Sequence, residues 1–138
     1  MWKKASLIVV TLTTLYTQTL IANDLDGAWH LRVMDGMEVR KARAILDFDM
    51  DKMKLSGFDA CNRIGGTLIK NSEHNITTPQ LMSTKMACRG KIFNWVSKRL
   101  HETLKEGFNI KEETKYGVKG ITLKSPKHEL FFKKMERD

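Results

Sequence analysis

Residues 91–107 read KIFNWVSKRLHETLKEG and form the strongest helix candidate in the chain. Their apolar side chains recur at spacings of three and four, which places them on one stripe of a helix. The stripe consists of Ile92, Phe93, Val96, Leu100 and Leu104. Gly107 is well placed to end the helix, because glycine accepts the backbone conformation that commonly follows a last turn. We therefore expect one amphipathic helix that begins at Cys88 or Lys91 and ends at Glu106.

Short segments with alternating apolar and polar residues, typical of strands, lie on both sides of this helix. The strand candidates cover residues 25–33, 39–48, 54–58, 67–70, 75–78, 108–112, 117–124 and 128–134. Turn signals separate most of them: Asp35-Gly36, residues 50–53, Gly65-Gly66, residues 71–75 and Ser125-Pro126-Lys127. Seven or eight short strands and one helix predict an α+β fold. We expect a strongly curved antiparallel sheet, or a small barrel, with the helix packed over its apolar face or one opening.

Residues 1–22 differ from the rest of the chain and predict a secretory signal peptide. Lys3 and Lys4 provide a positive start, and no charged residue follows before the end of the segment. This order suits insertion of an apolar segment whose basic end stays at the cytoplasmic face. We expect cleavage after Ala22, which leaves one domain, residues 23–138, in the periplasm or secreted. The alternative is an uncleaved membrane anchor, although about 18 residues is the low end for a spanning helix.

The composition describes a basic globular domain. Of the 138 residues, 41% are hydrophobic, which is enough for a core and too many for a disordered tail. The net charge is +8, and loss of the leader would remove only Lys3 and Lys4 from the 24 basic residues. Nucleic acid is rarely present outside the cytoplasm. The expected counterpart is therefore an anionic lipid, lipopolysaccharide, a cell-wall polymer or an acidic envelope protein. The alternative is that the charge only keeps the protein soluble.

Two segments outside the helix carry distinctive residues. The first is Gly57-Phe58-Asp59-Ala60-Cys61-Asn62-Arg63-Ile64-Gly65-Gly66, and the second is Thr84-Lys85-Met86-Ala87-Cys88. A cysteine followed by asparagine between glycines indicates a turn with positive φ, which Gly and Asn accept at low cost. On the residues alone, we interpret both segments as loops that fix local geometry.

Together these segments resemble the META domain of the HslJ type, a family of exported heat-shock proteins. The family has a Gly-Cys-Asn core with a glycine a few residues on, and a Thr-x-Met-Ala-Cys segment that leads into a helix. The matching positions here are Gly57, Cys61, Asn62, Gly65 or Gly66, Thr84, Met86, Ala87 and Cys88. Trp29 and Leu31 near the start and Leu130-Phe131 near the end extend the resemblance over residues 25–133.

The chain departs from the family pattern at two places. Ala60 precedes the cysteine where the family has glycine, which argues against a special backbone conformation there. Arg89-Gly90-Lys91 is shorter and more basic than the family's connection to the helix, which often carries a glutamate. The resemblance implies an envelope or secreted module with a bent antiparallel sheet and one helix. It also implies roles in stress response, antibiotic tolerance and, through similarity to secretion pilotins, secretion. It supplies no catalytic residue.

Cys61 and Cys88 are the two cysteines of the chain, and both belong to the part expected to be exported. An even number of cysteines in an oxidising compartment favours a disulfide. The alternatives are two buried free thiols and a redox-active pair, although no Cys-x-x-Cys motif is present. We therefore take Cys61 and Cys88 as disulfide candidates.

Residues that could carry metal or hydrolytic chemistry are scattered. The four histidines have no zinc-ligand spacing, and no serine lies in a nucleophile-elbow context. Asp47, Asp49 and Asp51 alternate as in a calcium loop, but the required glycine and terminal glutamate are missing. The sequence therefore predicts a non-catalytic protein with no metal and no other cofactor.

Basic tracts are the best candidates for a binding surface. They are Arg40-Lys41 with Arg43, Lys85 with Arg89 and Lys91, Lys98-Arg99, and Lys133-Lys134. Trp95 lies near the tracts around the helix start, and either seats on an anionic membrane surface or packs into the core. We predict an interaction or stress-protection module. The alternative is a pilotin-like or lipid-binding protein that assists secretion or envelope assembly. Its apolar groove would be lined by residues such as Phe48, Phe93 and Phe131.

Overall fold

The computed structural model describes residues 25–136, which form one curled antiparallel sheet and one α-helix. The strands are β1 (Gly27–Met34), β2 (Met37–Glu38), β3 (Ile45–Asp49), β4 (Lys54–Phe58), β5 (Arg63–Thr67), β6 (Ile69–Lys70), β7 (Asn75–Thr77), β8 (Met82–Ser83), β9 (Phe108–Lys115), β10 (Val118–Lys124) and β11 (Glu129–Lys134). The helix α1 (Lys91–Glu106) connects β8 to β9, and a short 3-10 helix, η1 (Arg40–Ala42), lies between β2 and β3. The expected signal peptide and its cleavage site lie outside the described residues.

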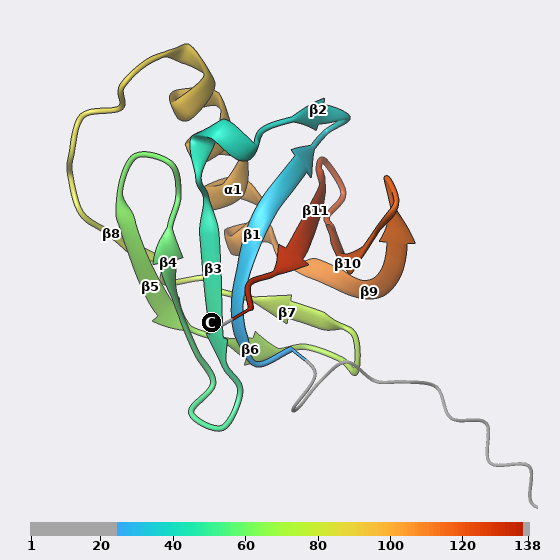
Figure 1. Cartoon of the computed structure of the whole chain (residues 1–138). Helices are drawn as coiled ribbons and strands as arrows, with labels where there is room; N and C mark the ends of the chain where they lie inside the picture. Colours follow the sequence, from blue (N-terminus) through green and yellow to red (C-terminus); the bar gives the residue numbers. More distant parts are fainter. Residues whose placement is uncertain (1–24, 137–138) are drawn as a thin grey trace, which may run out of the picture.

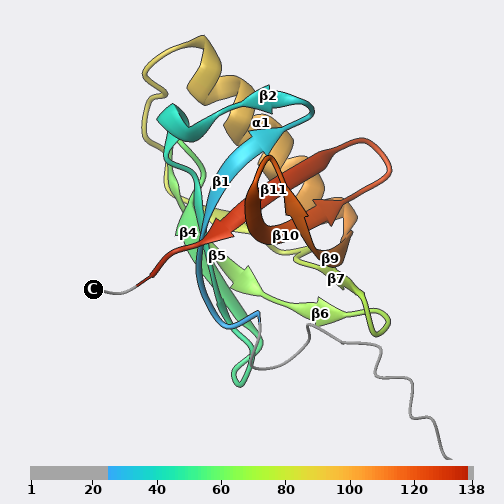
Figure 2. The ribbon, with the colours of Figure 1, turned by 45° about the vertical axis from the view of Figure 1, so that its right-hand side comes forward.

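The strands pair in the order β6-β7-β9-β10-β11-β1-β3-β4-β5-β8, with β2 added beside β1. Because β11 lies on one side of β1 and β3 on the other, β1 joins the early hairpins to the C-terminal strands. The sheet curls into a half-barrel, with α1 behind the strands in the view of Figure 1 (Figures 1 and 2). The expected α+β class and curved antiparallel sheet are confirmed. The strand number exceeds the expected seven or eight because β2, β5 and β8 were not expected, and β2 and β8 are only two residues long.

The expected apolar stripe of the helix packs into the core. Val96, Leu100 and Leu104 are fully buried, and Ile92 and Phe93 pack against the same cluster. The strands supply the rest of the core, including Leu31, Leu46, Phe48, Phe108, Ile121 and Phe132. Burying a large apolar side chain contributes about 1.5–3 kcal/mol, so this shared cluster fixes α1 on the sheet. The helix ends at Gly107 as expected.

The prediction of one strand over residues 39–48 is wrong in its first half. Residues 40–42 form η1, and Arg43 follows with a left-handed backbone, at a φ of 56°. Val39 and Ala42, three residues apart, are both buried by this turn. Ala42, Ala44, Leu46 and Phe48 are also all buried, so the alternation that suggested a strand continues into η1 although the backbone there is helical.

The prediction that Gly65-Gly66 breaks the chain is also wrong. Both glycines lie inside β5, paired with β4. A Cβ added at Gly66 would come within 2.6 Å of Thr78 Cγ2 and 3.1 Å of the Gln80 carbonyl oxygen. The glycine therefore permits a close approach of the following loop to the strand and does not serve a turn.

His128 holds three segments together beside the helix. Its Nδ1 lies 2.8 Å from Asp35 Oδ2 in the β1–β2 turn, and its Nε2 lies 2.9 Å from Glu102 Oε2 on α1. Burial disfavours a charged imidazole, but the hydrogen bonds to Glu102 and Asp35 outweigh it and raise the pKa of His128. The same contact with His128 lowers the pKa of Glu102. The imidazolium therefore bridges two carboxylates from distant parts of the chain.

Replacing His128 with glutamine is expected to destabilise the protein in a pH-dependent way. Because the folded-state pKa is raised, the stabilisation is complete below the unfolded pKa of about 6.5 and is lost as the pH rises through the folded pKa. We expect urea unfolding to show a loss of about 1–2 kcal/mol at pH 5.5 and a much smaller loss at pH 9. His74→Gln, at an exposed position in the β6–β7 turn, is the matched control. An equal loss at both pH values would contradict a charged His128.

Candidate functional site

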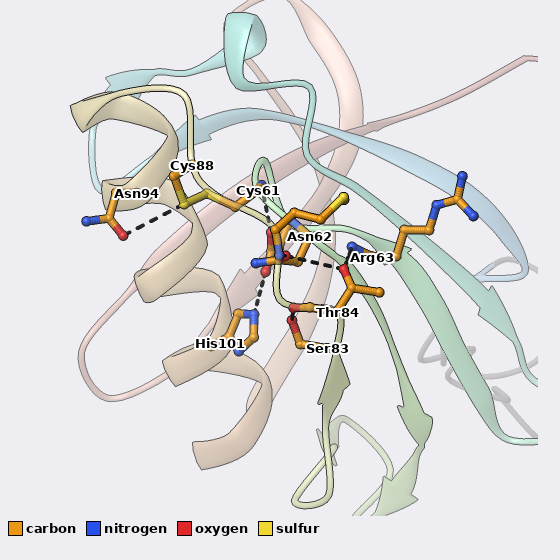
Figure 3. The surroundings of a disulfide bond; sticks show 10 residues. Cys61, Asn62, Arg63, Ser83, Thr84, Cys88, Asn94 and His101 are labelled. Carbon is orange, nitrogen blue, oxygen red and sulfur yellow. Dashed lines mark hydrogen bonds and ion pairs between the residues drawn. A yellow bond between two sulfur atoms is a disulfide. The ribbon is translucent and has the colours of Figure 1, made fainter.

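The second motif segment lies in the longest run of exposed residues in the described chain, residues 82–91. A disulfide joins Cys88 in this run to Cys61, which is 5% exposed and follows β4. The two Cα atoms are 4.7 Å apart (Figure 3). The predicted disulfide is confirmed, and the alternative of two buried free thiols is wrong. The bridge ties a surface loop to the wall of the sheet.

Asn62 is the second connection between the two motif segments. Its side-chain Oδ1 accepts hydrogen bonds from the Met86 N–H at 2.5 Å and from the Thr84 hydroxyl at 3.3 Å (Figure 3). Thr84 in turn accepts a hydrogen bond from the Arg63 N–H at 3.1 Å and donates its own N–H to the Arg63 carbonyl at 3.0 Å. The motif residues therefore meet in space, and they share one role, which is to hold the exposed loop against β5.

The left-handed backbone position of this loop falls on Ala60, and not on Asn62. Ala60 has a φ of 88°, a conformation that costs a residue with a Cβ on the order of 1–2 kcal/mol. The prediction that alanine excludes a special conformation here is therefore wrong. A strained backbone conformation persists where surrounding contacts hold it in place. The adjacent disulfide and hydrogen bonds hold Ala60 in this way.

The carboxylate of Asp59 accepts hydrogen bonds that order this loop. The sequence analysis did not single out this residue. It is fully buried, and its Oδ1 accepts the N–H groups of Cys61 at 2.8 Å and Asn62 at 2.6 Å. Its Oδ2 lies 2.5 Å from Nε2 of His101 on α1 (Figure 3). Burial raises the pKa of Asp59, but the hydrogen bonds from His101 and from the two backbone N–H groups outweigh it and lower the pKa. An aspartate at a bend is an Asx-turn signal that could have singled out Asp59.

A surface hollow of about 620 Å³ opens beside the disulfide. We call it the basic hollow and define it by six of its lining residues: Lys41, Arg43, Phe58, Met86, Arg89 and Phe93. Ala42, Ala60, Cys61 and Ala87 complete its wall. Two of the basic tracts singled out in the sequence, around residues 40–43 and 85–91, thus face each other across one depression. The tracts at residues 98–99 and 133–134 are not part of it.

The comparisons with known proteins agree with this geometry. The sequence model of the META domain family matches residues 20–136. The chain belongs to the META domain family. Two NMR structures share the fold of this META domain. One is 27% identical, with a TM-score of 0.63 over 79% of this chain and 89% of the other chain. The second is from Burkholderia xenovorans and is 20% identical, with a TM-score of 0.61 over 82% of this chain and 85% of the other chain. No curated protein matches the sequence significantly.

The apolar groove considered for a lipid-binding META domain is not formed by the three phenylalanines that we named for it. Phe48 lies in the core at 2% exposure, Phe93 lines the basic hollow, and Phe131 lines a different hollow on the other side of η1. Trp95 packs partly against the core, with the Arg99 guanidinium 4.1 Å from its ring centroid. The interpretation of Trp95 as a packing residue is therefore the correct one.

Between residues 25 and 136, no group of three His, Cys, Asp or Glu side chains is arranged to hold a metal ion. Over the same residues, no helix has both the length and the apolar character that a bilayer span requires. The aspartates at positions 47 and 49 are exposed on β3, and Asp51 lies in the turn after it. The basic hollow remains the best candidate site.

Proposed function

We propose that this META domain is a non-catalytic, exported envelope protein that binds an acidic partner protein at the basic hollow. One observation carries the proposal: two basic segments meet across a concave surface that the disulfide and Asn62 hold in place. The leader, in which an uncharged apolar stretch follows Lys3 and Lys4, supports export. The disulfide supports it too, because disulfides persist in oxidising compartments.

The charges of the basic hollow are available to a ligand. Among residues 25–136, no carboxylate lies within 4.0 Å of the side-chain nitrogens of Lys41, Arg43 or Arg89. Uncompensated cations around a depression raise the local concentration of anions and speed their association. An acidic segment is therefore the ligand that the hollow fits best by charge.

The apolar residues of the hollow add a second requirement for the ligand. Met86 is 51% exposed. Its hydrogen bond to Asn62 involves only the backbone N–H and does not occupy the side chain. Methionine adapts its shape readily and is common at binding surfaces. Together with Phe58 and Phe93, it provides an apolar floor beneath the cations. The expected ligand is a protein segment with both acidic and apolar side chains, as an envelope interaction module would need.

The same floor supports a second candidate function, pilotin-like or lipid binding in secretion or envelope assembly. A lipid or lipopolysaccharide also combines negative charge with apolar chains. The basic hollow is concave, and a concave surface receives the side chains of a protein segment more readily than the flat surface of an anionic membrane. For this reason we place the protein partner first.

Site-directed photo-crosslinking in cells tests the proposal. A photo-reactive residue replaces Met86 in the full-length chain, with the same residue at exposed Ser72 as the control position. We expect one protein adduct from position 86 and none from position 72. The double charge reversal Lys41→Glu/Arg89→Glu should reduce the adduct by about tenfold or more, because close charge pairs govern both encounter and retention.

The matched control for charge is Lys111→Glu/Lys124→Glu, which reverses two exposed lysines on β9 and β10 away from the hollow. This variant should keep the adduct. Identical adducts from positions 72 and 86, or an adduct that survives charge reversal in the hollow, would refute a protein partner at this site. A lipid or lipopolysaccharide adduct at position 86 would instead favour the second candidate function.

A further inference from the structure

A β-bulge in β1 gives the outer face of the half-barrel an unusual residue, Arg32. The pairing of β1 with β11 runs from Leu31 opposite Phe132 directly to Val33 opposite Phe131, so Arg32 is the extra residue. Leu31 and Met34 are buried on either side, whereas Arg32 and Val33 are both half-buried. A bulge re-aims side chains in this way, and bulges are common next to binding sites.

The guanidinium of Arg32 is incompletely satisfied. Its Nε is buried from solvent and has no hydrogen-bond partner among residues 25–136. No carboxylate in this part of the chain lies within 4.0 Å of the Arg32 side-chain nitrogens. A buried donor without an acceptor costs about 1–3 kcal/mol, and more when the group is charged. An acceptor supplied by a ligand would remove this cost.

The surroundings of Arg32 on one side are strongly basic. A hollow of about 500 Å³ is lined by Arg32 together with His30, Arg40, Arg43, Lys133 and Lys134, and by one carboxylate, Glu136. Burial, followed by the positive charge of Arg32, lowers the pKa of His30. Of these cations, Arg40 is already paired with Glu38. The hollow therefore has a positive potential that Arg32, Arg43 and Lys133 leave uncompensated.

On its other side Arg32 borders a small apolar hollow of about 260 Å³. Its apolar residues are Val33, Tyr116, Val118 and Phe131, and Arg32 and Arg40 line both hollows. Gly36 and Glu38 complete the lining, and the Glu38 carboxylate is the one paired with Arg40. Phe131 is 3% exposed, yet it lies outside the main core cluster and makes an edge-to-face contact with Tyr116, at 5.7 Å between ring centroids. Two aromatic rings and two valines thus form a separate apolar surface beside the buried cation.

We propose that the two hollows joined by Arg32, which we call the Arg32 groove, bind a small anionic amphiphile. Its chemistry is a carboxylate or a phosphate monoester attached to a short apolar group. The arginine fork holds the anion with charge-assisted hydrogen bonds, and the apolar group lies against Tyr116, Val118 and Phe131. The ligand is a free molecule and not a membrane surface, because the two hollows are concave and a flat surface would not fill them.

This inference does not depend on the proposed function. The basic hollow and the Arg32 groove meet only at Arg43, which lines both. Arg32, Tyr116 and the valines lie outside the basic hollow. Failure of either proposal therefore leaves the other intact, and substitutions at Arg32 or Met86 separate them.

Calorimetric titration of the full-length chain with hexyl phosphate tests the proposal. We expect saturable 1:1 binding, weaker binding of inorganic phosphate, and none of 1-hexanol. Arg32→Gln should weaken binding of hexyl phosphate by about 10- to 100-fold, and Arg32→Lys should recover only part of it, because lysine lacks the fork. Arg63→Gln is the matched control at an exposed arginine of β5 and should bind as the wild type does.

A second variant provides an independent test in case an Arg32 substitution disturbs the fold. Tyr116 is 66% exposed in the β9–β10 turn, so the Tyr116→Ala variant should fold. It should bind hexyl phosphate more weakly than the wild type does, and inorganic phosphate equally well. Proton–nitrogen NMR spectra should show shifts confined to the elements that line the groove, which are β1, β2, η1 with the residues that follow it, the β9–β10 turn, β10 and β11. The proposal is overturned by absence of hexyl phosphate binding at millimolar concentration, by equal affinity of Arg32→Gln and wild type, or by binding only to phosphatidylglycerol vesicles.

Discussion

Replacing both cysteines with alanine is expected to lower the free energy of unfolding by about 3–4 kcal/mol. The disulfide closes a loop of 27 residues, and in the chain-entropy account this restricts the unfolded chain by that amount. The local effect should be largest in the exposed loop, because Cys88 is its covalent tie to the sheet. Only hydrogen bonds would then hold the loop, those that Asn62 accepts from Met86 and Thr84 and those between Arg63 and Thr84.

Urea unfolding followed by tryptophan fluorescence measures this loss, since Trp29 is buried in the core. The wild type in reductant should resemble Cys61→Ala/Cys88→Ala, while the double variant itself should not respond to reductant. Amide exchange should rise most at residues 84–90. A wild type whose stability is the same with and without reductant would contradict the expected role of the bridge.

The parts of the fold that depend on local spacing could be predicted from the sequence. The helix begins at Lys91 and ends before Gly107, as its apolar stripe and its glycine stop indicated. The strand at residues 54–58 has the expected bounds. The disulfide followed from the number of cysteines and the expected compartment, and needed no knowledge of the topology.

The parts that depend on long-range contact could not be predicted. Asp59 and His101 are 42 residues apart, and no periodicity relates an Asx-turn to one histidine on the polar side of a helix. The left-handed conformation of Ala60 was missed for the same reason, because its cost is met by contacts from other segments. The bulge at Arg32 is equally invisible in the sequence, since Leu31, Arg32 and Val33 continue an ordinary alternation.

The candidate site shows the same division between local and long-range information. The basic residues around positions 40 and 89 were evident as separate tracts. Their meeting across one hollow required both η1, which the sequence analysis took for a strand, and the disulfide that draws the loop inward. Charge composition therefore led to the expectation of an anionic ligand, while the location that we propose for its binding depended on the fold.

Gly57→Ala is expected to lower the free energy of unfolding by more than about 3 kcal/mol, although the sequence suggested only a strand end at this glycine. Gly57 lies within β4, paired with Leu46 on one side and Ile64 on the other. A Cβ added here would overlap the carbonyl oxygen of Ile45, and would come within 3.1 Å of the Ile45 carbonyl carbon and 3.2 Å of the Leu46 Cα. These are backbone atoms of β3, which cannot move aside as a flexible side chain would. Overpacking costs about 1–3 kcal/mol where side chains can shift, so a backbone clash should cost more.

The matched control is Gly65→Ala in the neighbouring strand β5. A Cβ at Gly65 would meet its nearest neighbour, the Leu55 carbonyl oxygen, at an ordinary 3.5 Å. Since both substitutions restrict the unfolded chain alike, their difference reports the native-state clash. We expect Gly65→Ala to change the urea midpoint little, by the equivalent of less than about 1 kcal/mol. Two equal, small losses would mean that β3 and β4 separate easily, and that this close approach does not determine the curl of the sheet. A large loss at Gly57 alone would place a tight backbone constraint on the half-barrel two residues before Asp59, the residue that orders the disulfide loop.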